Sequence, residues 1–295
     1  MSGPLVSVVI PTYKRPQKLL RAVRSVLDQE YENWELFVVN DAPEMDVRDY
    51  LPNNNSINYI HHNKNKGASA ARNNGIRMSN GQYVALLDDD DAWKEKKLKR
   101  QVEKFNSLDD SYGLVYTGRD IMEGDDLVQT HIPNEDGWIH NTLLHQNVIP
   151  SNTPLIRQEC FNKIGYFDTK LESVQDLDLW IRISKKYKSA VIPESLAISH
   201  IGHKDRITTN MERKYRGHKR LIEKHQDAFQ SNPSAIAKQY RRLGLFATRS
   251  GRRVEGSVYF FRSFQNNPKN WKIALYFLTP LIPSKYIKKY YYCQE

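Results

Sequence analysis

The 295-residue chain has few of the features that mark disulfide-stapled, zinc-binding or membrane-spanning proteins. Its two cysteines, Cys160 and Cys293, give no disulfide framework and no Cys/His spacing suited to zinc. The longest apolar region near the end, at 273–283, is too short to span a bilayer and is broken by two prolines. The N-terminus lacks a basic leader, a long apolar stretch and a small-residue cleavage site, so we expect no signal peptide. These absences favour a globular protein in a reducing, cytoplasmic setting.

Acidic residues are scarce in the last third of the chain. Residues 201–295 contain 20 Lys and Arg against 6 Asp and Glu, whereas residues 1–200 contain 24 against 28. The formal net charge of +10 therefore belongs to the C-terminal region. Such asymmetry indicates contact with a phosphate-rich surface, either nucleic acid or anionic lipid, or else a solvated helical surface.

Strands and helices alternate through the first hundred residues. Hydrophobic runs predict buried strands at 5–10, 34–40, 57–62 and 81–87, and helical spacing predicts helices from Pro16, over 67–79 and over 94–107. This rhythm predicts an α/β fold with a mostly parallel sheet covered on both faces. Further strands are expected at 113–120 and 126–132, in antiparallel arrangement, and at 189–193. Helices are expected at 138–145, at 175–187 and from about 207, including a helical hairpin at 237–268.

Polar residues directly follow three of the predicted strands, in the segments PTYKR, NDAPE and DDDD. The carboxyl ends of parallel strands meet at one crevice, where ligands of such folds bind. The run Asp88 to Asp91 is the most unusual, because four adjacent carboxylates raise one another's pKa unless a cation compensates. A helix cap would explain one of them. All-oxygen ligands suit Mg²⁺ or Mn²⁺ shared with substrate phosphates, so we predict a metal-phosphate site here.

A second acidic site lies on the helix predicted at 175–187. Its core-facing stripe at helical spacing consists of Leu177, Trp180, Ile181 and Ser184. Asp176 and Asp178 lie about 200° apart around this helix, at ~100° per residue, so only one of them can face the crevice. The alternative for either is a helix-start charge or a salt bridge.

Four segments together resemble glycosyltransferase family 2, whose members are inverting enzymes with the GT-A fold. The segments are VSVVIPTYKRPQKLLRAVRSVLDQEYENWELFVVNDA, NKGASAARNNGI, GQYVALLDDDDAW and GYFDTKLESVQDLDLWIRIS. They cover residues 5–190 in the family's order and spacing. The resemblance implies a mostly parallel, Rossmann-like sheet flanked by helices in a catalytic domain at 1–205. Its nucleotide-sugar half would be at about 1–110 and its acceptor half at about 111–205, followed by a basic helical region at 206–295.

The resemblance also assigns the nucleotide-sugar contacts. A base pocket, which needs an apolar or aromatic wall with a few polar groups, would be lined by Pro11, Thr12, Tyr13 and Arg15. Asp41 would hydrogen-bond the base, and Arg72 would supply charge-assisted hydrogen bonds near the diphosphate. The position before Asp41 is often acidic in the family and is Asn40 here. The alternatives are an ordinary turn at Thr12 and Tyr13 and a surface position for Arg72.

The metal and catalytic assignments follow from the same resemblance. The family's Asp-x-Asp motif fits Asp88 on the ribose side and Asp90 as the main metal ligand, with Asp89 as an alternative for either and Asp91 as a helix cap. His200, with His203 nearby, would complete the metal or diphosphate site unless both lie on an exposed loop. Asp176 would be the catalytic base, preceded by Gln175 where the family has Glu.

These assignments predict a metal-dependent, inverting transfer of a hexose from a nucleotide-diphosphate sugar, most commonly UDP-linked, to a hydroxyl of a glycan or lipid-linked acceptor. The segment with Trp271, Tyr276, Phe277 and Leu278 near Lys272, Lys285, Lys288 and Lys289 would rest on an anionic membrane, or pack on the catalytic domain or a dimer partner. Two other functions stay open at this point: a catalytically silent nucleotide-sugar binding module, suggested by Gln175, and a nucleic-acid-binding metal enzyme. The second is disfavoured because the tail lacks a recognition helix or stacking motif, so we expect no nucleic-acid partner.

Overall fold

The computed structural model describes residues 3–202, 210–269 and 276. These residues fall into two compact units, which are described separately below. The first unit contains the residues up to 140, 147–169 and 176–202. The second unit contains 141–146, 170–175 and the described residues from 210 onward.

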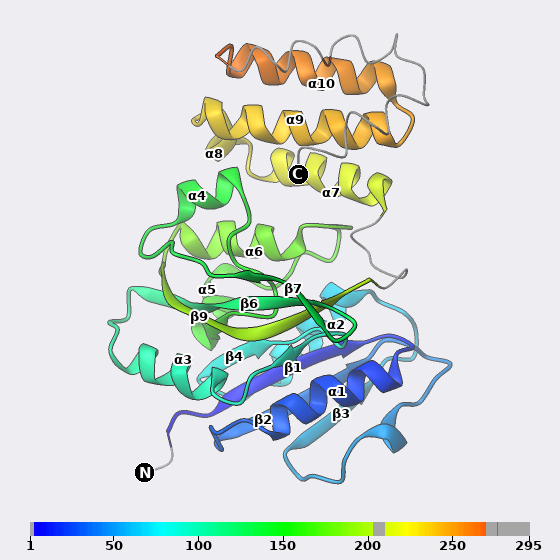
Figure 1. Ribbon diagram of the computed structural model, residues 1–295, viewed down its shortest axis with the longest axis vertical. Coiled ribbons are helices and arrows are strands. Elements are labelled where there is room, and N and C mark those ends of the chain that lie inside the picture. Colours follow the sequence, from blue (N-terminus) through cyan, green and yellow to red (C-terminus); the bar gives the residue numbers. More distant parts are fainter. Residues whose placement is uncertain (1–2, 203–209, 270–275, 277–295) are drawn as a thin grey trace. The chain divides into compact units, whose positions relative to one another are not determined.

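The first unit is built on a nine-stranded mixed sheet with the order β3-β2-β1-β4-β8-β6-β9-β5, in which β7 also pairs with β6 (Figure 1). The strands in chain order are β1 (Val6–Thr12), β2 (Trp34–Asn40), β3 (Ile57–His61), β4 (Tyr83–Leu86), β5 (Ala92–Trp93), β6 (Tyr112–Glu123), β7 (Asp126–His131), β8 (Leu155–Arg157) and β9 (Lys188–Ile201). The predicted α/β class is confirmed.

The N-terminal half of this sheet is parallel, as the sequence predicts. β1 pairs in parallel with β2 and β4, and β2 pairs in parallel with β3. Helix α1 (Pro16–Leu27) begins with a proline at its first turn and buries the stripe Leu19, Ala22, Val23 and Val26. Because such crossovers are right-handed, α1 and α2 (Ala68–Met78) cover opposite faces of these strands, as Figure 1 shows. β3 is an edge strand and is partly exposed, whereas we expected it to be buried.

The C-terminal half of the sheet mixes directions. β6 pairs in parallel with β9 and antiparallel with β7 and β8. β9 extends from the predicted segment at 189–193 as far as Ile201, so it is much longer than expected. β5, β8 and the helix α5 (Gln158–Ile164) were not expected from the sequence. The remaining elements of this unit are η1 (Arg48–Tyr50), α3 (Lys97–Asn106) and α6, which runs over Gln175–Ser184 and starts in the second unit.

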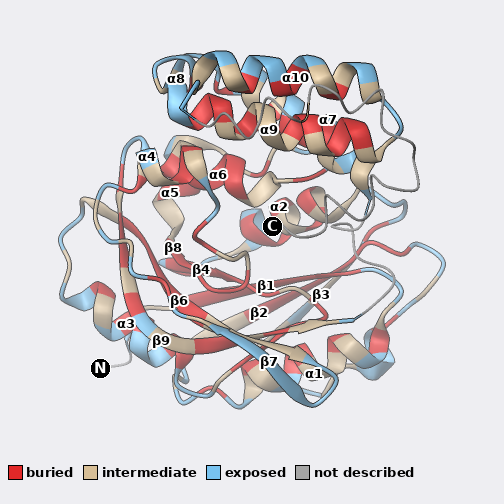
Figure 2. Cartoon of the chain, turned by 45° about the horizontal axis from the view of Figure 1, so that its top comes forward, coloured by how far each residue is buried: buried red, intermediate tan, exposed pale blue. Residues whose placement is uncertain are grey.

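Burial follows the sheet order. Figure 2 shows the central strands buried, and their side chains form one core with α1 and α3. β7 is exposed along almost its whole length, because it pairs only with β6.

The second unit is helical, as predicted. Its helices are α7 (Met211–Lys224), α8 (Gln226–Gln230), α9 (Pro233–Arg249) and α10 (Arg253–Asn266). It also contains α4 (His140–His145) except for its first residue, which belongs to the first unit. α9 and α10 form the predicted hairpin. They approach closely because Gly244 lies under the Phe260 ring, where a Cβ would come within 2.7 Å of that ring. Asn210 and Asn232 cap α7 and α9 by accepting backbone N–H bonds.

The described helices include none that is both long and apolar enough to cross a membrane. The predicted membrane-facing segment around Trp271 to Lys289 lies outside the described residues, except for Tyr276.

Candidate active site

The four consecutive aspartates have four different sets of partners in the first unit. Asp88 accepts hydrogen bonds from Arg72 Nη2 and, at 3.0 Å, from Ser151 Oγ. Arg72 comes from α2, and its guanidinium also lies over the Phe167 ring, 5.6 Å from the ring centre. The predicted cation on α2 is therefore in direct contact with the first carboxylate of the run.

Asp89 and Asp90 share one cation from the loop after β1. Arg15 Nη1 lies 3.3 Å from Asp89 Oδ1 and 3.2 Å from Asp90 Oδ2. Asp89 also accepts a hydrogen bond from Thr12 Oγ1 at 2.8 Å and one from the Tyr13 amide at 3.4 Å. The strand end at PTYKR and the acid run therefore meet, as the shared crevice of parallel strands predicts.

Asp91 has a structural role and does not cap a helix. Helix α3 begins at Lys97 with Lys96 as its N-cap residue, so the predicted capping role of Asp91 is wrong. The buried Asp91 carboxylate accepts from Asn152 Nδ2 at 2.7 Å, Ser199 Oγ at 3.3 Å and the His200 amide at 3.2 Å. These bonds tie the end of the acid run to β9.

Burial raises the pKa of two carboxyl groups of the acid run, those of Asp89 and Asp91. Desolvation raises the pKa of Asp89 to about 6, against the opposing effects of the Thr12 hydrogen bond and the Arg15 charge. The neighbouring charges of Asp90 and Asp88 act in the same direction as burial. The pKa of Asp91 is likewise raised, chiefly by burial. A divalent cation at this site would favour the charged forms of both groups.

Asp176 lies at the start of α6 and interacts electrostatically with the acid run. Its carboxylate accepts from Asn147 Nδ2 at 2.8 Å. Burial raises the pKa of Asp176, and the Leu177 amide, Asn147 and the Arg72 charge partly offset this. Burial lowers the pKa of Arg72, but the charges of Asp88, Asp176 and Asp89 raise it above its ordinary value. Arg72 thus contacts Asp88 directly and interacts electrostatically with Asp176 and Asp89.

Asp178 points elsewhere, as the helical period predicts. It is fully buried and accepts from Arg182 Nε at 3.0 Å and Nη2 at 2.9 Å. The same arginine donates to the carbonyls of Ile164, Gly165 and Tyr166. The salt-bridge alternative for Asp178 is therefore confirmed. Gln175 donates to the Leu171 carbonyl at 3.1 Å.

Asp41 organises the loop before α2. Its carboxylate contacts His62 Nδ1 at 2.8 Å and accepts from the amides of Lys66 and Gly67 at 2.8 and 2.7 Å. Gly67 adopts φ 87°, a conformation that favours glycine. Sequence reasoning missed His62, whose buried ring also contacts Asn74. Contact of Asp41 with a base stays a prediction.

The other predicted residues have mixed positions. Pro11 is buried within β1, opposite Val39, whereas Tyr13 is exposed. The Asn40 side-chain amide donates to the Met45 carbonyl and to Tyr59 Oη, so hydrogen bonds within the protein occupy the donors of this neutral residue. His200 lies inside β9, so the exposed-loop alternative for this residue is wrong, and its role in the metal or diphosphate site stays a prediction. His203 lies outside the described residues.

Sequence reasoning also missed three polar residues that hold the site together. Asn147, Ser151 and Asn152 lie between α4 and β8, and each hydrogen-bonds an aspartate named above. Their segment has no periodic pattern, and the one available signal is its content of Asn and Ser near a predicted strand end.

The donor chemistry of the site fits a hard divalent cation. Asp88, Asp89 and Asp90 offer carboxylate oxygens on a single loop, the ligand type that Mg²⁺ and Mn²⁺ prefer. Among residues 3–202, 210–269 and 276, no group of three or more His, Cys, Asp or Glu is positioned to hold a metal ion by itself. Phosphate oxygens and water would therefore supply part of the coordination shell.

Comparison with known proteins identifies the family. A model described as Glycosyl transferase family 2 matches residues 7–164. A protein of Escherichia coli named as a colanic acid biosynthesis glycosyl transferase, WcaA, is 28% identical over 279 residues, covering 91% of this chain and 96% of the relative. A protein of Bacillus subtilis named as a teichuronic acid biosynthesis glycosyltransferase, TuaG, is 31% identical over 188 residues, covering 62% of this chain and 73% of the relative.

Solved structures show the same fold. The Staphylococcus aureus protein TarS, residues 1–349 in complex with UDP-GlcNAc, has a TM-score of 0.66 at 16% identity, covering 96% of this chain and 87% of that one. The mannosyltransferase PcManGT of Pyrobaculum calidifontis, in complex with GDP-Man and Mn²⁺, has a TM-score of 0.58 at 16% identity, covering 99% and 88%. Because the family model spans more than half of the sequence, the chain belongs to glycosyl transferase family 2 and is a nucleotide-sugar glycosyltransferase of the GT-A fold.

Proposed function

We propose that the protein is a metal-dependent, inverting glycosyltransferase that moves a hexose from a nucleotide-diphosphate sugar, most simply a UDP-sugar, to a hydroxyl of a glycan or lipid-linked acceptor. The observation that carries the proposal is the convergence of Arg15, Arg72 and the acid run Asp88 to Asp90 at one end of the parallel strands. The named colanic and teichuronic acid relatives support a role in cell-envelope polysaccharide synthesis. The solved structures with UDP-GlcNAc and with GDP-Man and Mn²⁺ support the donor class and the metal.

Asp176 is the proposed general base. The acceptor oxygen forms a bond to the anomeric carbon while its proton passes to the Asp176 carboxylate, and the carbon–oxygen bond to the diphosphate breaks with its electron pair on the nucleotide. Burial raises the pKa of Asp176 toward working pH, which suits a general base. Asn147 orients this carboxylate through its hydrogen bond.

The diphosphate would lie between the acid run and two arginines. Mg²⁺ or Mn²⁺ would be held by Asp90 with one further protein ligand from among Asp88, Asp89 and His200, and when bound it would neutralise charge on the departing diphosphate. Arg72 and Arg15 pair with Asp88 and Asp90 in this structure. Once a cation neutralises these carboxylates, both arginines would donate to phosphate oxygens of the donor.

The experiment compares Asp176→Asn and Asp90→Asn with the exposed Asp126→Asn control, which removes one carboxylate on β7. Asp176→Asn should lower transfer by about 10²–10⁴-fold, the usual contribution of a general base, while calorimetric affinity for UDP-sugar and Mn²⁺ stays near wild type. Asp90→Asn should lose the manganese-dependent part of donor binding. Normal turnover by Asp176→Asn would remove that residue from the role, and no donor binding by the wild type would reject the proposed function.

A further inference from the structure

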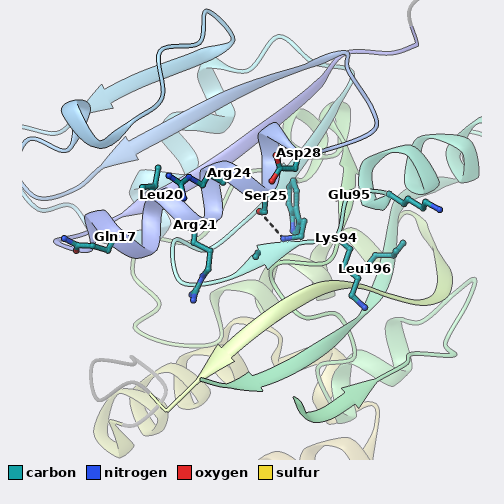
Figure 3. A pocket seen from close by; sticks show the side chains of 12 residues that line it. Gln17, Leu20, Arg21, Arg24, Ser25, Asp28, Lys94, Glu95 and Leu196 are labelled. Atoms are coloured by element: carbon teal, nitrogen blue, oxygen red, sulfur yellow. Dashed lines mark hydrogen bonds between the residues drawn. The ribbon is translucent and has the colours of Figure 1, made fainter. Parts of the chain in front are cut away.

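A groove of about 680 Å³ runs along one side of α1 in the first unit (Figure 3). The helix and its C-cap residue contribute residues at helical spacing to this groove, namely Gln17, Leu20, Arg21, Arg24 and Ser25 from α1 and Asp28 from the cap. The other wall is formed by β5, the three residues that follow it and Leu196 of β9. One face of α1 therefore packs into the core, and another face lines the groove.

The rim of the groove is cationic. Arg21 and Arg24 come from α1, and Lys94 and Lys96 come from the opposite wall. Lys94 pairs with Asp120, 2.7 Å away. Within the described parts of the chain, Arg21, Arg24 and Lys96 make no ion pair, so their charges are available to an anionic ligand.

The groove also offers apolar surface and acceptors for hydroxyl groups. Leu20, Trp93 and Leu196 form apolar wall, and the Trp93 indole is fixed by its Nε1–H bond to the Asn152 carbonyl at 2.8 Å. Asp28 and Glu95 add carboxylates beside the cations. Apolar walls with a few placed polar groups are typical of ligand sites. Because sugar rings have apolar C–H faces and many hydroxyl donors, this mixture suits a carbohydrate.

The groove is joined to the acid run through Arg21. Its Nη2 donates to the Asp90 carbonyl at 2.5 Å, and its buried Nε has no hydrogen-bond partner in the described structure. The walls of the groove at 92–96 directly follow the aspartates in the chain. A ligand in the groove would therefore lie beside the backbone that carries the proposed metal ligand.

We infer that this groove binds an acidic glycan, with sugar carboxylates on Arg24 and Lys96 and sugar rings against Leu20 and Leu196, and that it extends the acceptor site. This inference rests on the proposed function and adds the chemical class of the acceptor. Asp28 and Glu95 favour a glycan over DNA, because their carboxylates can accept hydrogen bonds from the free ring hydroxyls of a glycan, whereas the deoxyribose units within a DNA chain have no free hydroxyl.

The test uses the full chain and oligogalacturonate as the acidic-glycan probe, with its carboxyl-reduced form and single-stranded DNA of equal length as comparisons. The groove variant is Arg24→Glu with Lys96→Glu. The matched control is Lys185→Glu with Lys186→Glu, two exposed lysines outside the groove that undergo the same charge change. Neither pair belongs to the proposed catalytic or donor-binding residues. Calorimetry at low salt measures binding of each probe and, separately, of UDP with Mn²⁺.

We expect oligogalacturonate affinity to fall tenfold or more in the groove variant and to stay near wild type in the control, with nucleotide binding unchanged in both. The acidic probe should also bind tighter than its reduced form, and the difference should shrink as salt screens the charges. Equal affinity for the reduced probe, equal or tighter binding of DNA, or no loss in the groove variant would overturn the inference. If the wild type binds oligogalacturonate but does not bind UDP with Mn²⁺, the proposed function is rejected instead.

Discussion

The buried Asp89 carboxylate should make the folded protein less stable as pH rises through the mildly acidic range. Its pKa in the folded state is about 6, whereas the ordinary value is 3.8. The folded state therefore binds more protons than the unfolded chain between these values, and the free energy of unfolding falls as pH rises from about 4 to about 6. A shift of about two units corresponds to about 3 kcal/mol, at roughly 1.4 kcal/mol per unit.

Asp89→Asn should remove this penalty, because the amide stays neutral and its oxygen can still accept from Thr12 and Arg15. Relative to wild type, the variant should gain about 3 kcal/mol of unfolding free energy between pH 4 and pH 8. Urea denaturation of metal-free protein at several pH values measures this difference, with Asp125→Asn at an exposed turn as the single-carboxylate control. Parallel pH profiles of the variant and wild type would refute the reasoning.

Binding should reverse the same penalty. When Mn²⁺ and UDP bind the wild type at pH 5.5, the cation favours the charged form of Asp89, so protons should be released to the buffer. Calorimetry in buffers of different ionisation enthalpy counts these protons, and Asp89→Asn should release fewer. Identical proton release by both proteins would place Asp89 outside the cation's influence.

Three further predictions concern single residues. Val174 has φ 56°, a costly conformation for a β-branched residue, so Val174→Gly should raise the unfolding free energy by about 1 kcal/mol in urea denaturation, and a loss of stability would contradict this. Asp91→Ala removes the carboxylate that accepts from the Asn152 side chain and the His200 amide and should cost about 2 kcal/mol, whereas wild-type stability would argue against its tie to β9. Burial holds the pKa of Lys97 well below its usual value of 10.5, so the folded state binds fewer protons than the unfolded chain and the free energy of unfolding falls as pH drops below that value. Lys97→Met should remove this pH dependence of stability. An unchanged pH profile of stability in the variant would contradict the prediction.

The elements found correctly from the sequence are those whose signal is local. β1, β2 and β4 are apolar runs that end at polar residues, and α1 has a regular apolar stripe. β5 and β8 have two and three residues, too few for periodicity, and they exist because β9, β4 and β6 offer them partners. Such pairing across long sequence separations leaves no local trace.

The candidate site shows the same division. The helical period places Asp176 and Asp178 on different sides of α6, and the structure pairs Asp178 with Arg182 as that geometry allows. Four identical aspartates carry no local difference, so their separate partners come from tertiary contacts alone. Arg72 is 16 residues from Asp88, and His200 is 109 residues from Asp91.

The tie between Asp91 and β9 has a consequence for synthesis on the ribosome. β1 to β4 lie within the first 86 residues, so this half can pair early, when contacts are close in sequence. The acid run gains its last partners when Ser199 and His200 have emerged, more than one hundred residues later. An unfinished polypeptide therefore lacks a completed acid run, and we expect it to bind no nucleotide-sugar before the strand that fastens the loop has been made.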